Sequence, residues 1–309
     1  MNLWDAIILG LVEGLTEFLP VSSTGHLILV SHWLGLDDDP AARHAVNAFN
    51  IIIQGGAILA VLGLFWPRVM QMLRGLLGRD GAGLRLLINL GLSFLPAAVM
   101  GVLLNDWIEE RLFRPAPVTL ALFLGGVVLI LLRKWQRRVY HDSGPGEATI
   151  DAHAYVDLEH LSWRRALVIG LLQCLAMWPG TSRSMMTIIG GMLVGMRPRH
   201  AAEYSFLLGV PTLGGACAYK GYRTFFVDEH SVFEVLGAAE VLLGALVAAA
   251  SAAIAVKWMI GYLNRHGLAL FGWYRIVLAG TLAVLILDGR LKIEPKSATP
   301  ADDAPALIR

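Results

Sequence analysis

Residues 6–13 read AIILGLVE, and the same pattern returns in the second half of the chain as ALVIGLLQ at residues 166–173. Each stretch then reaches a proline and a turn rich in hydroxyl groups, PVSSTGH at residues 20–26 and PGTSRS at residues 179–184. At the prolines the two halves can be aligned in two registers that differ by one residue. The pattern predicts an internal repeat with a helix break in each copy, because proline lacks an N–H and disfavours helix in the residue before it.

The composition is that of a membrane protein rather than a water-soluble domain. Of the 309 residues, 56% are hydrophobic and only 16% are charged, whereas about one-quarter are charged in an average soluble domain. The mean hydropathy is +0.61. A net charge of +1 gives no electrostatic reason to expect nucleic acid as a partner. The two cysteines, Cys174 and Cys217, lie far apart in apolar surroundings, which excludes a disulfide framework and a cysteine-built metal site.

Six apolar stretches are long enough to cross a bilayer, which takes about 20 mostly apolar residues. Two further pieces, 6–19 and 166–178, are too short, and each is followed by a proline and a second short apolar run. We therefore predict an all-α integral membrane protein with six transmembrane helices and two re-entrant helical hairpins. The predicted hairpins are 6–36 and 166–196, and the predicted spans are 49–66, 84–104, 116–132, 204–222, 232–256 and 268–287.

The whole chain, 1–309, is expected to form one polytopic membrane domain made of two copies. Repeat one covers 1–138 and repeat two covers 163–290, with a polar cytoplasmic linker at 139–162 and a tail at 291–309. Because each copy holds three spans, an odd number, the second copy must be inserted upside down relative to the first. Such inverted repeats with broken helices place their binding site near the bilayer midplane, between the copies.

Basic residues in the short loops predict the orientation, since cytoplasmic loops carry an excess of Lys and Arg. The loop 67–83, the run 133–138 and the loop 257–267 are basic, and acidic segments alternate with them. The basic sites are expected in the cytoplasm and both termini on the extracytoplasmic side. The hairpin 6–36 then enters the membrane from outside.

The two broken segments are the candidate site. Backbone that leaves a helix at membrane depth must be buried in protein or face water. The hydroxyl residues after each proline are good N-caps for a restarting helix, and the free N–H groups of a helix N-terminus bind anions, phosphate above all. Two such termini, one from each copy, would converge on one anionic group.

Ionisable residues gather around these breaks. Glu13 and Glu17 are spaced i,i+4, so both carboxylates lie on one helical face within a turn of Ser22 and Ser23. Charged groups at membrane depth are costly and are functional candidates by default. The alternative is that the acids pair with a buried base. His26 follows in the first copy, and Arg183 in the second copy has the fork suited to binding phosphate.

Acids and a phosphate repel each other, so a shared pocket needs charge neutralisation. Either a divalent cation bridges carboxylate and phosphate oxygens, or one glutamate carries a proton. Two carboxylates in an oxygen-rich site favour Mg²⁺ or Ca²⁺ over zinc, with Glu13 and Glu17 as the ligands.

The stretch EGLTEFLPVSSTGH at residues 13–26 resembles the glutamate-rich signature of the undecaprenyl-diphosphate phosphatases, the bacitracin-resistance membrane enzymes. PGTSRS at residues 179–184, followed by Thr187, resembles their second signature. The resemblance covers nearly the whole chain, including Phe206-Leu207-Leu208, Pro211 and Tyr274-Arg275.

The resemblance implies hydrolysis of undecaprenyl diphosphate to undecaprenyl phosphate and inorganic phosphate at the outer face of the bacterial plasma membrane. This reaction recycles the carrier lipid for cell-wall polymers and gives tolerance to bacitracin. The implied partners are the polyprenyl diphosphate and membrane lipids, without nucleic acid. The sequence leaves the oligomeric state open, with a homodimer as one candidate. The implied cofactor is a divalent cation.

The resemblance also assigns roles to residues of this chain. Glu13 and Glu17 would hold the metal or act as acid and base, and Arg183 would grip the diphosphate. Ser23 is the candidate nucleophile and His26 its proton partner, although metal-activated water fits equally well. The substrate hydrogen-bonding residues would be Ser22, Thr24, Ser182, Ser184 and Thr187.

The main alternative is a transporter. A lipid-phosphate flippase or an anion carrier would use the same inverted repeat and would also need Arg183. The clustering of two acids and a histidine in one copy favours an enzyme. Arg275, inside an apolar span, either supports the site or extends its charge to the membrane interface.

Overall fold

The computed structural model describes residues 1–36, 40–140, 155–226, 236–263 and 265–289. Throughout these ranges every regular element is a helix. The prediction of an all-α fold is therefore confirmed for the described part of the chain. Most of the predicted linker 139–162 and the tail 291–309 lie outside the described residues.

Two hairpins of short helices stand where the sequence predicts broken segments. The first consists of α1 (Leu3–Glu17) and α2 (Ser23–Trp33), and the second of α7 (Trp163–Leu175) and α8 (Arg183–Leu193). The longest of the four, α1, has 15 residues, about 22 Å at 1.5 Å per residue. This is shorter than the roughly 30 Å hydrocarbon core of a bilayer, so no helix of the two hairpins crosses it alone.

The two hairpins also match in register. Helices α2 and α8 begin at Ser23 and Arg183 and end at Trp33 and Leu193, which is a constant offset of 160 residues. The same offset relates residues 6–13 to residues 166–173. The structure therefore selects between the two registers left open at the prolines: the helix starts align without a gap, and the prolines are displaced by one residue.

Long helices surround the hairpins. Within the described ranges, five of them contain a stretch long and apolar enough to cross a membrane: Ala45–Leu64, Gly81–Leu104, Pro115–Leu132, Ala238–Leu263 and Ala269–Leu287. These stretches belong to α3 (Pro40–Leu64), α5 (Gly81–Leu112), α6 (Pro115–Tyr140), α11 (Ala238–Leu263) and α12 (Ala269–Leu287). They overlap five of the six predicted spans.

The sixth predicted span, 204–222, lies in α9 (Pro198–Phe226), which is not among these five. Much of α9 is buried between other helices, and residues 201–209 are almost wholly covered by protein. A helix that contacts protein rather than lipid need not be uniformly apolar, which explains its weaker hydropathy signal. The predicted basic loop at 67–83 is not a loop throughout, because most of the helix α4 (Trp66–Leu76) lies in this segment.

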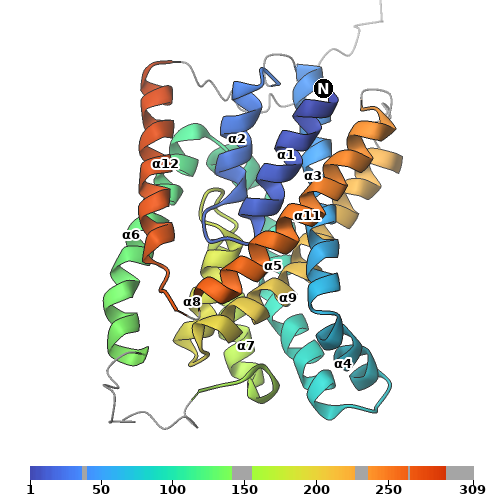
Figure 1. The fold of residues 1–309 in the computed structure, drawn as a ribbon, viewed down its shortest axis with the longest axis vertical. Coiled ribbons are helices and arrows are strands. Elements are labelled where there is room, and N and C mark those ends of the chain that lie inside the picture. Colours follow the sequence, from blue (N-terminus) through green and yellow to red (C-terminus); the bar gives the residue numbers. More distant parts are fainter. Residues whose placement is uncertain (37–39, 141–154, 227–235, 264, 290–309) are drawn as a thin grey trace, which may run out of the picture.

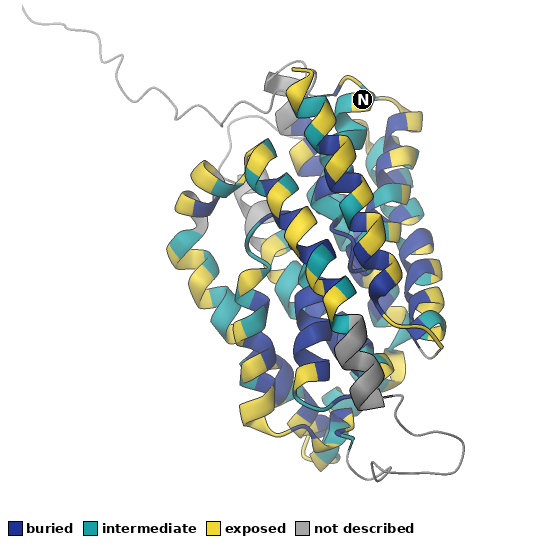
Figure 2. Ribbon diagram, turned by 90° about the vertical axis from the view of Figure 1, so that its left-hand side faces the viewer, coloured by how far each residue is buried: buried dark blue, intermediate teal, exposed yellow. Residues whose placement is uncertain are grey.

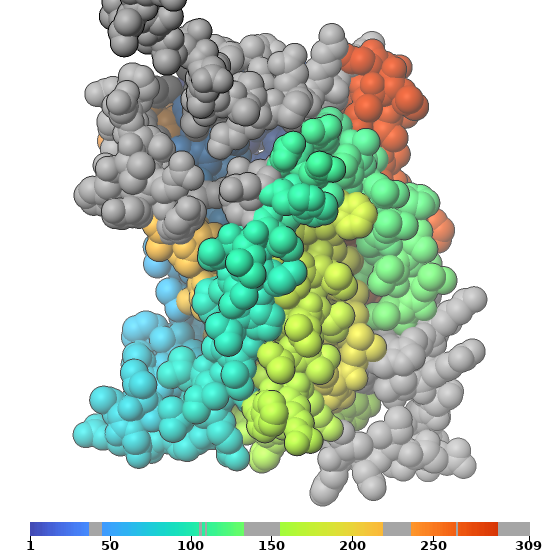
Figure 3. Space-filling model, turned by 180° about the vertical axis from the view of Figure 1, so that it is seen from behind, coloured from blue at the N-terminus to red at the C-terminus, as the bar shows by residue number. Residues whose placement is uncertain are grey.

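The two hairpins occupy opposite halves of the molecule. In Figure 1 the α1–α2 hairpin lies in the upper half, beside the N-terminus, and α7 and α8 lie in the lower half. Helix α1 packs along α11, α12 along α6, and α5 along α7. Figure 3, the view from behind, shows the yellow-green surface of the second hairpin between α5 and α6.

The core lies where the two hairpins meet the long helices. One large cluster joins Phe18 and Val21 from the first break to Met185 and Ile188 from α8 and Phe206 from α9. In Figure 2 the buried positions lie mainly on the inward faces of the helices, and the exposed positions follow their outward faces. Many outward side chains are large and apolar, among them Leu103, Leu131, Leu246 and Val277, as expected of surfaces that contact lipid.

Candidate active site

Helix α1 carries both acids of the site on its buried face. Glu13 is 1% exposed and Glu17 is 7% exposed. The helix starts at a capping box, in which Asn2 and Asp5 bond each other's backbone N–H groups. The same face holds Gly14, whose missing side chain lets α1 approach the backbone of α11 at Ala248. This close packing fixes the depth of the two carboxylates.

The breaks after α1 and α7 end in the same unusual backbone conformation. Ser22 has φ 73° and Ser182 has φ 77°, and they are the two non-glycine residues with positive φ in the described part of the chain. Each is the N-cap of the restarting helix. Positive φ is unfavourable for residues with a Cβ, and such strain concentrates at functional sites.

The tips of the two hairpins meet in the centre of the protein. Arg183 Nη2 lies 3.2 Å from Glu17 Oε1, and the Ser184 hydroxyl donates to the Leu19 carbonyl at 2.8 Å. Arg183 Nη1 also donates to the Ser205 carbonyl of α9 at 2.8 Å. The expected convergence of the two breaks is therefore present, and it brings Glu17 and Arg183 into direct contact.

Ser23 and His26 are placed differently from the expected proton-transfer pair. The Ser23 hydroxyl donates to Glu17 Oε2 at 2.6 Å. His26 Nδ1 bonds the Ser22 carbonyl at 2.7 Å, and its Nε2 lies 2.6 Å from the Tyr274 hydroxyl. A carbonyl only accepts, so Nδ1 carries a proton. In this structure the group poised to take the Ser23 proton is Glu17 rather than His26.

The other hydroxyls named from the sequence surround the start of α8. Ser182 accepts from the Met185 N–H at 3.3 Å and lies 3.0 Å from the Ser184 hydroxyl. Thr187 is buried and bonds the Arg183 carbonyl and Ser205. Ser22 is buried at the other break, and Thr24, in the first turn of α2, is half-buried. Their role as substrate ligands stays a prediction.

The sequence analysis did not predict the positions of two residues at the site, Tyr274 and Arg275. The Tyr274 hydroxyl belongs to a residue 248 positions from its partner His26, and no local pattern indicates such a pair. Arg275, the next residue, is fully buried, so the alternative that its charge reaches the membrane interface is wrong. The sequence does offer one indication that these two residues matter, because a tyrosine and an arginine stand side by side in an otherwise apolar span.

Two buried polar atoms at the site have no hydrogen-bond partner among the described residues. One is the acceptor Oε2 of Glu13, and the other is the donor Nε of Arg183. A buried polar group without a partner is costly, so a ligand, an ordered water or a proton is expected at each. An unpaired carboxylate oxygen suits a cation or a proton, and an unpaired guanidinium N–H suits an anion.

The donor set fits a hard divalent cation in part. No group of three or more His, Cys, Asp or Glu side chains gathers as a metal site within the described ranges. The chain therefore offers two carboxylates, Glu13 and Glu17, and substrate and water oxygens would complete the coordination. This pattern is typical of Mg²⁺, which is bound by one or two carboxylates together with substrate phosphates.

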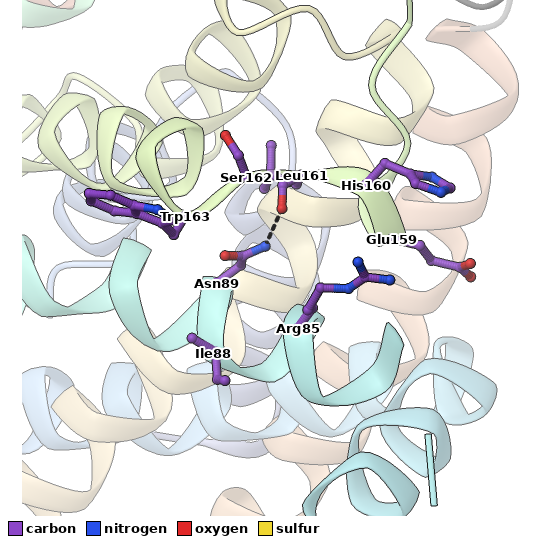
Figure 4. A pocket seen from close by; sticks show the side chains of 8 residues that line it. All are labelled: Arg85, Ile88, Asn89, Glu159, His160, Leu161, Ser162 and Trp163. Atoms are coloured by element: carbon purple, nitrogen blue, oxygen red, sulfur yellow. Dashed lines mark hydrogen bonds between the residues drawn. The ribbon is translucent and has the colours of Figure 1, made fainter. Parts of the chain in front are cut away.

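A separate hollow of about 380 Å³ opens at the other end of α7. Figure 4 shows its wall, with Asn89 donating to the Leu161 carbonyl at 2.7 Å, Arg85 on α5 and Trp163 at the start of α7. It contains none of the residues at the two breaks, and α7, at about 20 Å long, separates it from them. It is not part of the candidate active site.

Comparison with known proteins identifies the family of the chain. Residues 6–281 match the family model described as bacitracin resistance protein BacA. The chain belongs to this family. It is 45% identical over 280 residues to the undecaprenyl-diphosphatase of Azotobacter vinelandii (89% of this chain, 92% of the relative). It is 42% identical over 276 residues to that of Sorangium cellulosum (89% and 83%). The match of BacA-family sequence and apolar helices makes it a multi-pass membrane protein.

Proposed function

We propose that this BacA-family chain hydrolyses undecaprenyl diphosphate to undecaprenyl phosphate and inorganic phosphate, and so recycles the carrier lipid and gives bacitracin tolerance. The relatives that match over most of its length carry the name undecaprenyl-diphosphatase. The observation in the fold that carries the proposal is the meeting of the two breaks, where Glu17 and Ser23 of one copy face Arg183 of the other. Phosphoryl transfer needs little beyond such positioning and charge stabilisation.

The diphosphate would bind at the N-terminus of α8. Arg183 presents a buried guanidinium whose Nε is unpaired, and the positive end of the helix dipole lies beside it. Binding an anion there would satisfy this donor. It would also draw Arg183 away from Glu17, which frees the carboxylate for proton transfer.

Ser23 is the proposed nucleophile and Glu17 its base. The Ser23 hydroxyl proton would pass to Glu17 Oε2, 2.6 Å away, while the oxygen attacks the terminal phosphorus. The bridging P–O bond breaks, undecaprenyl phosphate leaves, and Ser23 holds the phosphoryl group. Water then cleaves the phosphoserine ester and releases inorganic phosphate, with Glu17 returning the proton to Ser23.

The carboxylates of Glu13 and Glu17 would hold a divalent cation, Mg²⁺ or Ca²⁺. When bound, the cation would neutralise the repulsion between these acids and the phosphate oxygens. The unpaired Oε2 of Glu13 supports this assignment.

In the membrane, the chain would have six spans, with α9 as the sixth, and two re-entrant hairpins that enter from opposite faces. The site would open to the outside of the bacterial inner membrane. Two observations support this orientation. The α1–α2 hairpin lies at the end of the molecule that carries the N-terminus (Figure 1), and the basic residues Arg68, Arg74 and Arg79 belong to α4 and its loop at the opposite end.

The deciding experiment measures phosphate release by the protein purified in detergent, where no compartments exist. With undecaprenyl diphosphate and Mg²⁺, the wild-type chain is expected to release phosphate, and Glu17→Ala and Arg183→Ala are expected to abolish release. Glu110→Ala and Arg164→Ala, which change exposed residues outside the site, are the matched controls. Substrate binding without any release would instead favour the lipid-phosphate flippase.

Two further measurements address the finer predictions. A membrane-impermeant thiol reagent should label Asn2→Cys in intact cells but Arg79→Cys only after lysis, in a background without the two native cysteines. The molar mass of the protein in detergent measures the predicted homodimer.

A further inference from the structure

Arg275 makes an unusual set of contacts for an arginine. It lies on α12, is 0% exposed, and donates to four main-chain carbonyls. Two belong to α6, Ala121 at 3.1 Å and Leu122 at 3.3 Å. The other two belong to the breaks, Pro20 at 3.4 Å and Gly180 at 2.7 Å. A buried guanidinium is stable only when its donors are satisfied, and here carbonyl dipoles satisfy them.

The two carbonyls of the breaks are equivalent in the internal repeat. Pro20 and Gly180 are 160 residues apart, and each lies two residues before the serine with positive φ. The catalytic candidates follow at once, Ser23 in one copy and Arg183 in the other. One side chain therefore holds the same point of both breaks.

Helix α6 is shaped to admit this side chain. A Cβ at Gly125 would collide with the guanidinium of Arg275. One turn of α12 away, a Cβ at Gly272 would lie 2.7 Å from the Gly126 carbonyl, so the two helices touch through glycines. The absence of a side chain at Gly125 thus makes the space through which Arg275 reaches the breaks.

The residue before Arg275 contacts the site as well. Tyr274 bonds His26 Nε2 at 2.6 Å, and the two rings lie nearly parallel. Helix α12 therefore holds α2 at His26 and both breaks at Pro20 and Gly180. These contacts come from a helix that carries neither of the acids nor Arg183.

We infer that Arg275 is a positioning residue, which sets the separation between Glu17 and Ser23 on one break and Arg183 on the other. It does not touch the substrate in this assignment; it acts through the two carbonyls. The inference rests on the proposed function, because it concerns the alignment of these groups on one diphosphate.

The test uses kinetics of the purified full chain with undecaprenyl diphosphate. Arg275→Lys keeps the charge but loses the planar fork that reaches four carbonyls. We expect kcat to fall by about 10- to 100-fold, the effect of a misplacement on the order of 1 Å. KM should change by less than about threefold, because Arg183 and the hydroxyls remain.

A second variant perturbs the same contact from the other side. Gly125→Ala keeps the arginine at position 275, but the added Cβ forces its guanidinium to move. We expect kcat to fall as it does in Arg275→Lys. Because both changes act on one contact, the double variant should be less impaired than the product of the two single effects predicts. The control is Gly280→Ala. Gly280 lies on α12, as Arg275 does, but its Cβ would face open space, so this variant should keep the wild-type kcat and KM.

The outcomes separate the two proposals. An active wild type together with normal kcat in Arg275→Lys and Gly125→Ala, even with a lowered melting temperature, would show that Arg275 is only structural and overturn the inference. A change confined to KM would also overturn it. A wild-type protein that releases no phosphate would overturn the proposed function, and the inference with it.

Discussion

Glu13 of α1 and Gln173 of α7 occupy the same position in the two copies, 160 residues apart, and both are buried (1% and 2% exposed). Gln173 is satisfied: its Nε2 donates to the Ser93 carbonyl at 3.4 Å, and its Oε1 accepts from Thr212 at 3.3 Å. Glu13 Oε2 has no partner among the described residues. The two hairpins therefore match in backbone but differ in chemistry, and the two acids of the candidate site, Glu13 and Glu17, both belong to the first copy.

This pair gives the first prediction. Glu13→Gln should lower phosphate release by at least about tenfold, and it should raise the Mg²⁺ concentration needed for half-maximal rate, because a cation ligand is lost. The protein should still fold, since an amide packs at the equivalent position of α7. A Mg²⁺ titration of the rate measures both effects, with Gln173→Asn as the control. An unchanged Mg²⁺ dependence would exclude Glu13 as a ligand.

Arg183→Lys should show the opposite kinetic pattern to Arg275→Lys. Lysine keeps the charge but cannot bind phosphate through two parallel hydrogen bonds. KM for the diphosphate should rise by about tenfold or more, the effect of roughly one lost charge-assisted bond. Steady-state kinetics across a range of substrate concentrations measure it. If KM stayed at the wild-type value, Arg183 would not bind the substrate in its ground state.

The sequence predicts the parts of this fold that depend on local pattern. The two short broken segments and five spans follow from proline and apolar length, and the convergence of the two breaks follows from internal repetition. The contacts of Tyr274 and Arg275 do not, because they join residues 95 to 255 positions apart. The pairing of Ser23 with His26 came from the family resemblance. In the structure α2 places His26 beside Tyr274, and the turn places Ser23 beside Glu17.

Ser22 and Ser182 provide a prediction about stability. A residue with a Cβ in such a conformation costs about 1–3 kcal/mol, and the Ser22 side chain makes no capping hydrogen bond. Ser22→Gly should therefore raise the free energy of unfolding by about 1 kcal/mol. Ser182→Gly should raise the free energy of unfolding by less, because this variant loses the hydrogen bond from the Met185 N–H to the Ser182 hydroxyl. Unfolding in detergent measures both variants, and a destabilised Ser22→Gly would contradict the strain.

Glu159, in the segment before α7, gives a prediction about pH. Hydrogen bonds from Arg68 and Gln71 hold the pKa of the Glu159 carboxyl below its usual value. Its contribution to stability is therefore complete above the unfolded pKa of about 4.3 and is lost as the pH falls through the lower folded pKa. At pH 7 the melting temperature of the wild type should be slightly higher than that of Glu159→Gln. The difference is small because the ion pair with Arg68 is partly exposed. The difference should vanish well below about pH 4; a difference that persisted there would contradict the ion pair.

The packing of α1 on α11, at residues away from the site, should determine where the carboxylates of Glu13 and Glu17 lie. A Cβ at Gly10 would lie 2.5 Å from the Gly244 carbonyl, and backbone atoms cannot move aside as a flexible side chain can. Gly10→Ala should therefore push α1 away from α11, at a cost of about 1–3 kcal/mol, and displace Glu13 and Glu17 with it. We expect a lower melting temperature together with a lower kcat. Gly91→Ala, at a helical glycine with nothing within 4 Å, should change neither. If Gly10→Ala lost stability but kept kcat, the depth of α1 would not be what places the carboxylates.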